Sequence, residues 1–295
     1  MIPIVMSHLT ILKKNEVYLQ IESDPHVFYE LSDQFTFELP GAKFMPQYRK
    51  RYWDGKIRLF NVNNGQIYVG LLDKIQKFCE DHGYSYSFVD NEYYGTPFEV
   101  NENISYEGVK DYITSISKYA PREYQIEGVY DALRHNRKLL ISPTASGKSL
   151  MIYSIVRYYV ERGENTLIVV PTTSLVEQMY KDFADYGWDV GSFCHKIYAG
   201  KERETDSQVI ITTWQSIYKL PRKYFERFSV VIGDEAHQFK SKSLISIMTK
   251  LDHAKYRFGF TGTLDGTQTH KWVLEGLFGP SYKIIGTKDL MTKGH

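Results

Sequence analysis

The sequence predicts an α/β protein, in which a parallel sheet with helices on both faces follows a small α+β domain. The chain has 295 residues, which is enough for two domains. It is 42% hydrophobic and 15% aromatic, so it can bury a sizeable core and is not a disordered chain. After Pro121, helical stretches alternate with short apolar runs, as in a parallel sheet. We expect domains at 1–90 and 121–295, joined by a linker and short helix at 91–120.

Composition excludes several other classes. Two cysteines, Cys79 and Cys194, exclude a disulfide framework and favour a reducing compartment. No apolar run approaches the roughly 18 residues that span a bilayer, and the first residues do not resemble a secretory signal. We therefore expect a soluble, cytoplasmic protein without a membrane partner. The net charge is only +1, so the average charge of the chain does not predict general binding to polyanions such as nucleic acids.

The N-terminal domain is predicted from alternating strand and helix signals. Asp24-Pro25 is typical of a helix start, and Asn64-Gly65 is the strongest short signal for a β-hairpin. Their order predicts a small α+β domain with a split βαβ topology. The expected elements are a strand at Glu16–Ile21, the helix after Pro25, a hairpin of Lys56–Val62 and Gln66–Gly70, a helix at Leu71–His82 capped by Gly83, and a strand at Tyr84–Val89.

The second domain is predicted from continuous apolar runs, which are typical of strands buried on both faces. A short helix near Ser105–Ser117 precedes them, and a helix at Leu150–Val160 follows the first. The expected strands are Lys138–Ile141, Thr166–Val170, Val209–Thr212, Val230–Ile232 and Phe258–Thr261.

The strongest chemical signal is the segment 142–149, SPTASGKS, between an apolar run and a helix. Backbone N–H groups at a helix N-terminus hold phosphate oxygens, and Lys148 adds a positive charge to them. The Ser149 hydroxyl can bind Mg²⁺. Ser142 stands where Gly or Ala is usual, and Ala145 where Gly is common. The alternative is an ordinary strand–turn–helix with a chance Gly-Lys-Ser.

A second signal is Asp234-Glu235-Ala236-His237 after the apolar run at 230–232. Adjacent carboxylates at a strand end suit metal-assisted phosphoryl transfer: Asp234 would hold Mg²⁺ and Glu235 would orient and deprotonate the attacking water. Gly233 stands where an apolar residue is usual, which predicts weak packing of the last inward position. A polar loop without catalytic function is the alternative.

Together these segments resemble motifs I and II of superfamily 2 helicases, and other motifs of that family follow in order. The resemblance covers about Pro121 to Gly279 and implies a RecA-like P-loop NTPase domain that uses ATP and Mg²⁺. It implies catalysis by Glu235, Lys148 and Asp234, and metal binding by Ser149 and Asp234. It implies ATP binding by Arg122, Gln125 (which would read adenine), Thr144, Ala145, Ser146, Gly147, Lys148 and Ser149, and coupling through His237, Thr261, Gly262 and Thr263.

The same resemblance assigns nucleic-acid contacts to Thr172 and Thr173 and to Thr212, Thr213 and Gln215. Short hydroxyl residues near helix starts suit contacts with phosphates. Simple helix capping is the alternative for the threonines, a core position for Trp214, and a structural histidine for His237.

A basic stretch with interleaved aromatic residues lies in the N-terminal domain. Arg49, Lys50, Arg51, Lys56 and Arg58 would neutralise phosphates, while exposed rings could stack on bases. A solvated basic hairpin is the alternative. Segments 44–48 (FMPQY) and 53–60 (WDGKIRLF), joined to the motor motifs, resemble the N-terminal domain of phage UvsW-type helicases, which implies ATP-driven remodelling of branched DNA in recombination or replication.

No second RecA-like lobe follows the motifs, so the chain is predicted to be a fragment of a longer helicase with little ATPase activity of its own. The missing lobe would supply arginine fingers, whose loss costs about 10³–10⁵ in rate in related NTPases. Three alternatives stay open: a non-catalytic nucleic-acid-binding accessory with a vestigial nucleotide site, an RNA helicase, and a restriction-type translocase subunit.

Overall fold

The computed structural model describes residues 7–97, 99–143, 146–200, 204–239, 241–262, 264 and 268–285. The chain divides into two compact units. Unit 1 comprises residues 1–98 and 265–277, and unit 2 comprises 99–264 and 278–295. Residues 265–277, which the sequence prediction placed in the motor domain, thus group with the N-terminal unit. None of the described helices is long and apolar enough to cross a membrane.

Unit 1 is built on a four-stranded sheet of order β5-β2-β1-β6. Strand β1 pairs antiparallel with β2 and parallel with β6. Alternate residues of β1 and β2 are buried, as are the apolar faces of α1 and α3. The elements are β1 (His8–Lys13), β2 (Tyr18–Glu22), α1 (Pro25–Gln34), β5 (Gln66–Tyr68), α3 (Leu72–His82) and β6 (Ser85–Val89).

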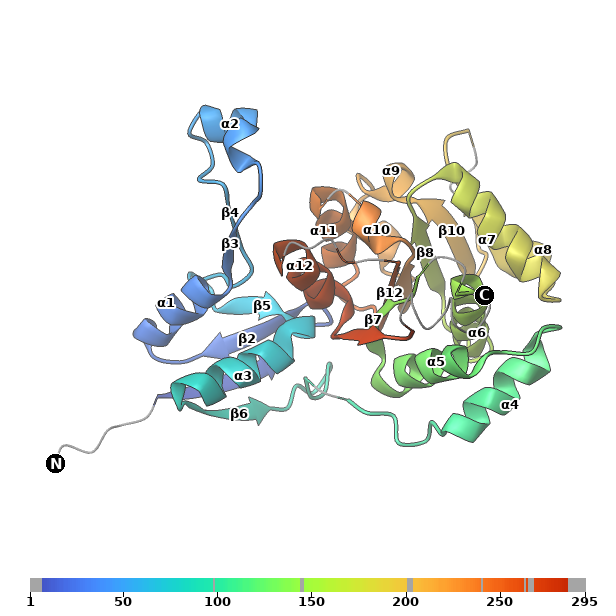
Figure 1. Cartoon of the computed structure of the whole chain (residues 1–295), viewed down its shortest axis with the longest axis horizontal. Helices are drawn as coiled ribbons and strands as arrows, with labels where there is room; N and C mark the ends of the chain where they lie inside the picture. The colour runs from blue at the N-terminus through green and yellow to red at the C-terminus, as the bar shows by residue number, and fades with distance from the viewer. Residues whose placement is uncertain are drawn as a thin grey trace. The chain divides into compact units, whose positions relative to one another are not determined.

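An antiparallel ribbon extends from this unit, and we call residues 36–58 the arm. Strands β3 (Thr36–Glu38) and β4 (Lys56–Arg58) pair with each other, and the short helix α2 (Pro46–Arg49) lies at the far end (Figure 1). Helix α2 buries none of its residues. The Trp53 indole N–H donates to the Lys56 carbonyl over 2.9 Å, which fixes the turn that leads into β4.

The predicted hairpin around Asn64-Gly65 is wrong in most of its pairing. The turn exists, because Gly65 has φ 67° and its N–H bonds to the Asn61 carbonyl over 2.8 Å. The predicted antiparallel pairing is confirmed only next to the turn, where Asn61 and Gln66 form a single bridge. Beyond it, β4 pairs with β3 and β5 pairs with β2, so these strands belong to different sheets.

Strands β5 and β6 run parallel, are joined through α3 and have β2 and β1 between them, which agrees with the predicted split βαβ topology. Strand β1, which the sequence analysis did not predict, lies in the centre of this sheet. The two helices and the strands at Glu16–Ile21 and Tyr84–Val89 are confirmed within two residues.

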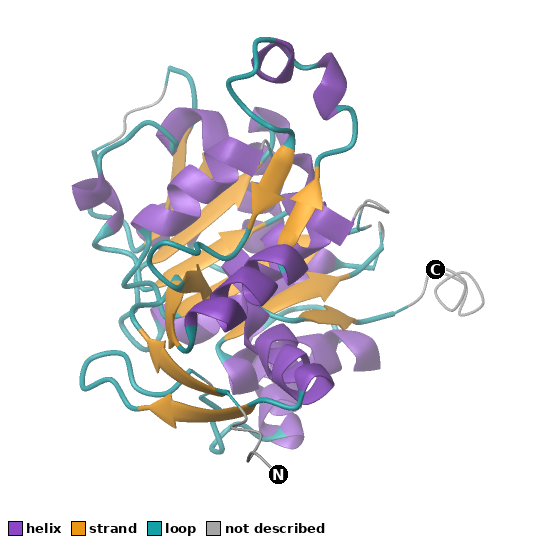
Figure 2. Cartoon of the chain, turned by 90° about the vertical axis from the view of Figure 1, so that its left-hand side faces the viewer, coloured by secondary structure: helices purple, strands orange, loops and turns teal. Residues whose placement is uncertain are grey.

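Unit 2 contains a seven-stranded parallel sheet of order β13-β7-β12-β11-β8-β10-β9, with helices on both faces (Figures 1 and 2). All five predicted strands are confirmed, and β9 and β13 add the two edges. The strands are β7 (Arg137–Ile141), β8 (Thr166–Val170), β9 (Cys194–Ile197), β10 (Val209–Thr213), β11 (Val230–Gly233), β12 (Tyr256–Thr261) and β13 (Ser281–Lys283).

The remaining helices come before or between these strands in sequence, and all of α12 except its last residue groups with unit 1. Helix α4 is the predicted short helix, and Ser105 caps it by accepting from the Gly108 N–H. The helices are α4 (Tyr106–Ile116), α5 (Glu123–His135), α6 (Lys148–Val160), α7 (Thr173–Asp185), α8 (Val190–Phe193), α9 (Trp214–Ile217), α10 (Arg222–Phe225), α11 (Ser241–Lys250) and α12 (Gln268–Phe278).

Both cysteines are buried and unpaired. Burial raises the pKa of Cys79 in α3 to about 11 and that of Cys194 in β9 to about 12. Neither cysteine forms a disulfide in this structure.

Candidate nucleotide and nucleic-acid sites

The motif segments gather at one edge of the unit 2 sheet. Strands β7, β8, β10, β11 and β12 run parallel, and a motif follows or includes the carboxyl end of each. Ligands of open α/β sheets bind at this edge, so the fold places the predicted site where its chemistry needs it.

The phosphate loop connects β7 to α6. The Ser142 N–H donates to the Thr261 carbonyl over 2.9 Å, and the buried hydroxyls of Ser142 and Ser146 hydrogen-bond each other. Gly147 has φ 75° and immediately precedes α6, whose first residue is Lys148. The loop therefore ends at a helix N-terminus, where backbone N–H groups can receive phosphate. Thr144 and Ala145 lie outside the described residues.

Gln125 contacts this loop. Its amide nitrogen donates to the carbonyl of Ser146 over 2.9 Å, and its amide oxygen accepts from the Arg122 N–H over 2.8 Å. A Cβ at Gly147 would lie 2.3 Å from the Gln125 amide nitrogen, so a side chain there would displace this amide, and the φ of 75° itself favours glycine. Tyr124, which sequence reasoning did not single out, also donates its hydroxyl to the Ser146 carbonyl over 3.0 Å. Adenine recognition by Gln125 stays a prediction.

The two carboxylates of motif II differ in their surroundings. Asp234 is 7% exposed and accepts the Glu235 N–H over 2.9 Å. Glu235 has φ 48°, a strained conformation for a non-glycine residue and one that clusters at active sites. Its carboxylate forms an ion pair with the Lys148 ammonium. The structure thus brings together Lys148 and Glu235, which are 87 residues apart in sequence.

A polar chain links motif II to motif III. The Nδ1 atom of His237 lies 2.7 Å from the Thr261 hydroxyl and 3.5 Å from a Glu235 oxygen. One ring nitrogen therefore faces both the end of β12 and the carboxylate that pairs with Lys148. Gly262 follows Thr261 and is half-buried, and Thr263 lies outside the described residues.

Ser149 has a partner that the sequence did not reveal. Its hydroxyl lies 2.7 Å from the hydroxyl of Tyr186, which follows α7. A hydroxyl and a carboxylate, from Ser149 and Asp234, are the oxygen ligands that Mg²⁺ prefers. No group of three or more His, Cys, Asp or Glu residues in the described ranges could hold a metal by itself. The donor set therefore fits an ion that also binds substrate phosphates.

Asp234 predicts a pH-dependent stability. Burial raises its pKa from 3.8 to about 6, although Lys148 acts in the opposite direction. Because the folded pKa exceeds the unfolded one, the folded state holds the extra proton between about pH 4 and 6, and stability falls as the pH rises through this range. The ionised carboxylate thus costs at most about 3 kcal/mol at pH 7.

We therefore expect Asp234→Asn, measured without Mg²⁺ or nucleotide, to raise the melting temperature by several degrees at pH 7.5. At pH 4 the variant and the unaltered chain should melt within about a degree of each other. Thermal unfolding followed by circular dichroism at both pH values checks this. A lower melting temperature for the variant at pH 7.5 would show that the attraction of Lys148 outweighs burial.

The predicted nucleic-acid contacts of unit 2 divide by exposure. Thr172 and Thr173 are exposed at the start of α7, where the Thr172 hydroxyl accepts from the Leu175 N–H over 3.4 Å. Gln215 is exposed in α9. Thr212 is fully buried and donates to the Thr213 carbonyl over 3.2 Å, and Thr213 is 4% exposed. Thr212 and Thr213 therefore present almost no surface to a phosphate, whereas the other three remain accessible candidates.

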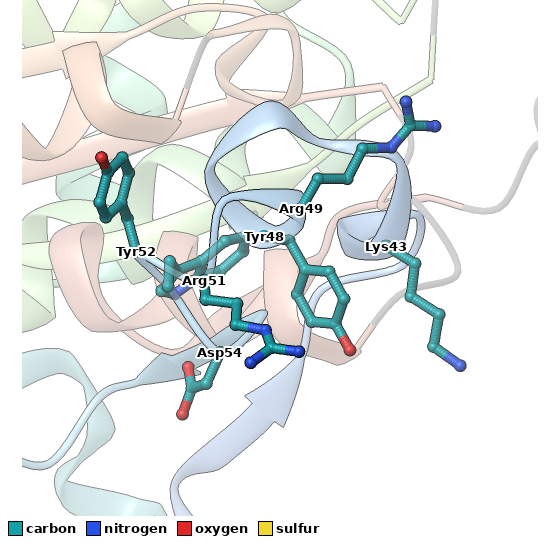
Figure 3. A pocket seen from close by; sticks show the side chains of 7 residues that line it. Lys43, Tyr48, Arg49, Arg51, Tyr52 and Asp54 are labelled. Carbon is teal, nitrogen blue, oxygen red and sulfur yellow. The ribbon is translucent and has the colours of Figure 1, made fainter.

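The arm carries the basic side chains, all of which are exposed: Arg49, Lys50, Arg51, Lys56 and Arg58. Lys43, Arg49 and Arg51 are among the residues that line a hollow of about 630 Å³. Figure 3 shows their side chains spreading from the α2 region. Phe44 and Tyr52 are also exposed, at 77% and 83%. Asp54 pairs with Arg58, which lowers the pKa of that carboxyl to about 2 and neutralises part of the charge.

Comparison with known proteins agrees with this geometry. A family model described as the res subunit of type III restriction enzymes matches residues 118–266, and a model of the UvsW N-terminal domain matches residues 9–90. The ATP-dependent DNA helicase uvsW of Enterobacteria phage T4 is 33% identical over 94% of this chain, which spans 56% of that protein. The DNA 3'-5' translocase XPB2 of Sulfurisphaera tokodaii is 33% identical over 48% of this chain and 30% of its own length.

Solved structures extend the likeness to the fold. A crystal structure of the UvsW helicase from bacteriophage T4 matches with a TM-score of 0.83 and 31% identity, covering 94% of this chain and 99% of that one. A second T4 UvsW structure matches with a TM-score of 0.84 and 31% identity, over 95% of this chain and 57% of the other. With the RecA-like motor lobe and the matched N-terminal domain, the chain belongs to the UvsW-type family of superfamily 2 helicases.

Proposed function

We propose that this chain is the DNA-binding domain and first motor lobe of an ATP-dependent DNA helicase or translocase that remodels branched recombination or replication intermediates. The observation that carries the proposal is the pairing of Lys148 with Glu235 at the sheet edge, beside a buried Asp234. The T4 relative, of which this chain spans 56%, is an ATP-dependent DNA helicase, which supports DNA as the substrate class. The cytoplasmic location expected from the sequence stays a prediction.

The residues have distinct tasks in this proposal. The α6 N-terminus and Lys148 bind the ATP phosphates, which requires Lys148 to leave Glu235. Glu235, once released, orients the attacking water and takes its proton. Ser149 and Asp234 would hold Mg²⁺, which neutralises phosphate charge when bound. A second RecA-like lobe in the same polypeptide would add arginine fingers.

In this proposal, changes at the ATP site are transmitted to DNA-contacting residues at the carboxyl ends of the strands. His237 lies between Glu235 and Thr261, so a change at the carboxylate alters the hydrogen bond to β12. The exposed Thr172, Thr173 and Gln215 follow β8 and β10 at the same edge and would contact the DNA backbone. The arm would bind phosphates near a junction.

ATPase activity tests the proposal. A two-lobed form of the protein should hydrolyse ATP at a rate that branched DNA increases at least about tenfold. The 295 residues alone should be nearly inactive, because in this proposal a second lobe supplies the arginine fingers. A branched DNA and an RNA duplex of the same sequence should compete unequally, in favour of DNA. The chain is instead a non-catalytic accessory if the two-lobed form hydrolyses no ATP with any nucleic acid and its DNA affinity is the same with and without nucleotide.

A further inference from the structure

Two glycines lie side by side just before motifs II and III. Gly233 ends β11 and directly precedes Asp234, and Gly259 lies two residues before Thr261 in β12. The two are register partners in the parallel pair of strands. Neither is among the glycines with positive φ, so backbone conformation does not require them.

The ring of Phe278 occupies the space that side chains there would need. A Cβ at Gly233 would lie 2.7 Å from the ring Cζ atom, and a Cβ at Gly259 would lie 2.8 Å from Cδ2. Phe278 is fully buried. The prediction that Gly233 leaves the end of its strand weakly packed is therefore wrong, because a distant aromatic ring fills the position. Since neither glycine has a side chain, the Phe278 ring packs directly against the backbone of the two strands.

Phe278 is held in place by the chain that follows it. Gly279 has φ 142°, and a Cβ there would lie 2.7 Å from the Arg137 carbonyl. The Pro280 carbonyl then accepts the Leu139 N–H over 3.2 Å, and β13 continues along β7. The ring is thus anchored to the strand that leads into the phosphate loop.

Phe278 is also the last residue of α12, whose other residues group with unit 1. In that unit, Trp272 packs against Phe35 and meets Phe37 of β3 edge to face, with ring centroids 4.9 Å apart. Glu275, which is nearly buried, pairs with Lys74 over 2.9 Å. Helix α12 therefore carries both Trp272, which packs against Phe37 of the arm, and Phe278, whose ring lies where side chains at Gly233 and Gly259 would be.

We propose that Phe278 is a positioning residue for the Asp234–Glu235 turn, and that α12 transmits DNA binding on the arm to it. A shift of β3 moves Trp272, the rigid helix carries the shift to Phe278, and the ring displaces the backbone at Gly233. This inference rests on the proposed function, because it needs both an ATP site and a DNA-binding arm.

The test measures how branched DNA changes the affinity of the 295-residue chain for a fluorescent, non-hydrolysable ATP analogue in the presence of Mg²⁺. The ratio of dissociation constants without and with DNA is the coupling factor, and coupled sites typically give about 5- to 150-fold. We expect at least about fivefold for the unaltered chain. Trp272→Leu should bring the ratio below about twofold while leaving the nucleotide affinity without DNA unchanged.

Phe278→Leu should also lower the coupling factor, and adding Gly233→Ala to it should restore at least half, because the smaller leucine leaves room for a methyl group. Gly233→Ala alone should be destabilising. Phe225→Leu is the matched control: this buried phenylalanine of α10 should lose stability when shortened but keep the coupling factor. Melting temperatures for every variant separate loss of fold from loss of coupling.

If Trp272→Leu keeps the coupling factor of the unaltered chain, the inference is overturned, even where Phe278→Leu fails to fold. It is equally overturned if the unaltered chain binds both ligands without any coupling. If the unaltered chain binds neither the analogue nor DNA, the proposed function itself fails. The two failures are therefore distinguishable.

Discussion

Glu235→Gln should abolish DNA-stimulated ATP hydrolysis by the two-lobed protein, with kcat falling by about 10²–10⁴. Glutamine keeps the size and one hydrogen-bonding oxygen, but it cannot accept the proton of the attacking water. ATP binding should persist or strengthen, because Lys148 loses the carboxylate that pairs with it and one negative charge leaves the phosphate site. Steady-state kinetics and titration with a fluorescent ATP analogue measure both effects.

Glu226→Gln provides the control for this change. Glu226 is exposed at the end of α10, so removing its charge should leave kcat and the nucleotide affinity unchanged. A Glu235→Gln protein that keeps full activity would remove Glu235 from the catalytic role. Weaker ATP binding in that variant would contradict the competition between Glu235 and the phosphates for Lys148.

Neutralising the arm should have the second largest effect. Changing Arg49, Lys50 and Arg51 to glutamine should weaken binding of branched DNA by about 10- to 100-fold at low salt. The slope of log K against log salt should become shallower by about 2–3, because fewer counterions are released. These three are exposed, and Asp54 pairs with Arg58 rather than with them. Fluorescence anisotropy over a range of salt concentrations measures both quantities.

A control protein with Lys14, Lys77 and Lys110 changed tests whether DNA affinity depends on the position of the lost charges or only on their number. These lysines are exposed and lie outside the arm, and their replacement by glutamine removes the same nominal charge. This control should lower the affinity far less than the arm variant. Equal losses in the two proteins would mean that the arm is not the binding surface.

The motor fold was predictable because its signals are local. Each strand of the parallel sheet is a continuous apolar run, and each motif follows one, so the chain order alone places Lys148, Asp234 and Thr261 at one edge. The edge strands β9 and β13 were missed because they are short and only partly apolar. In unit 1 the Asn64-Gly65 turn is real, but pairing depends on long-range partners that a dipeptide does not encode.

The candidate site was likewise predictable only in part. Sequence motifs identify the groups that touch phosphate and metal, because that chemistry restricts the residue types. They do not reveal the partners that hold those groups, such as Tyr186 at Ser149, Tyr124 at Ser146 or Phe278 beneath Gly233. These partners belong to other helices and strands that pack against the site. Because many residue types could fill such positions, no sequence motif marks them. Thr212 lies in a strand that the sequence predicted to be buried, and its burial conflicts with the nucleic-acid contact that the motif resemblance implied.

The two buried thiols make this protein convenient for site-directed labelling. With pKa values of about 11 and 12, Cys79 and Cys194 hold only about one part in 10⁴ to 10⁵ as thiolate at pH 7, and thiolate is the form that maleimides attack. A cysteine introduced at the exposed Tyr52 on the arm, with a second one on α10, would therefore outcompete both native thiols. Paired fluorophores could be attached without first removing any natural residue from the core.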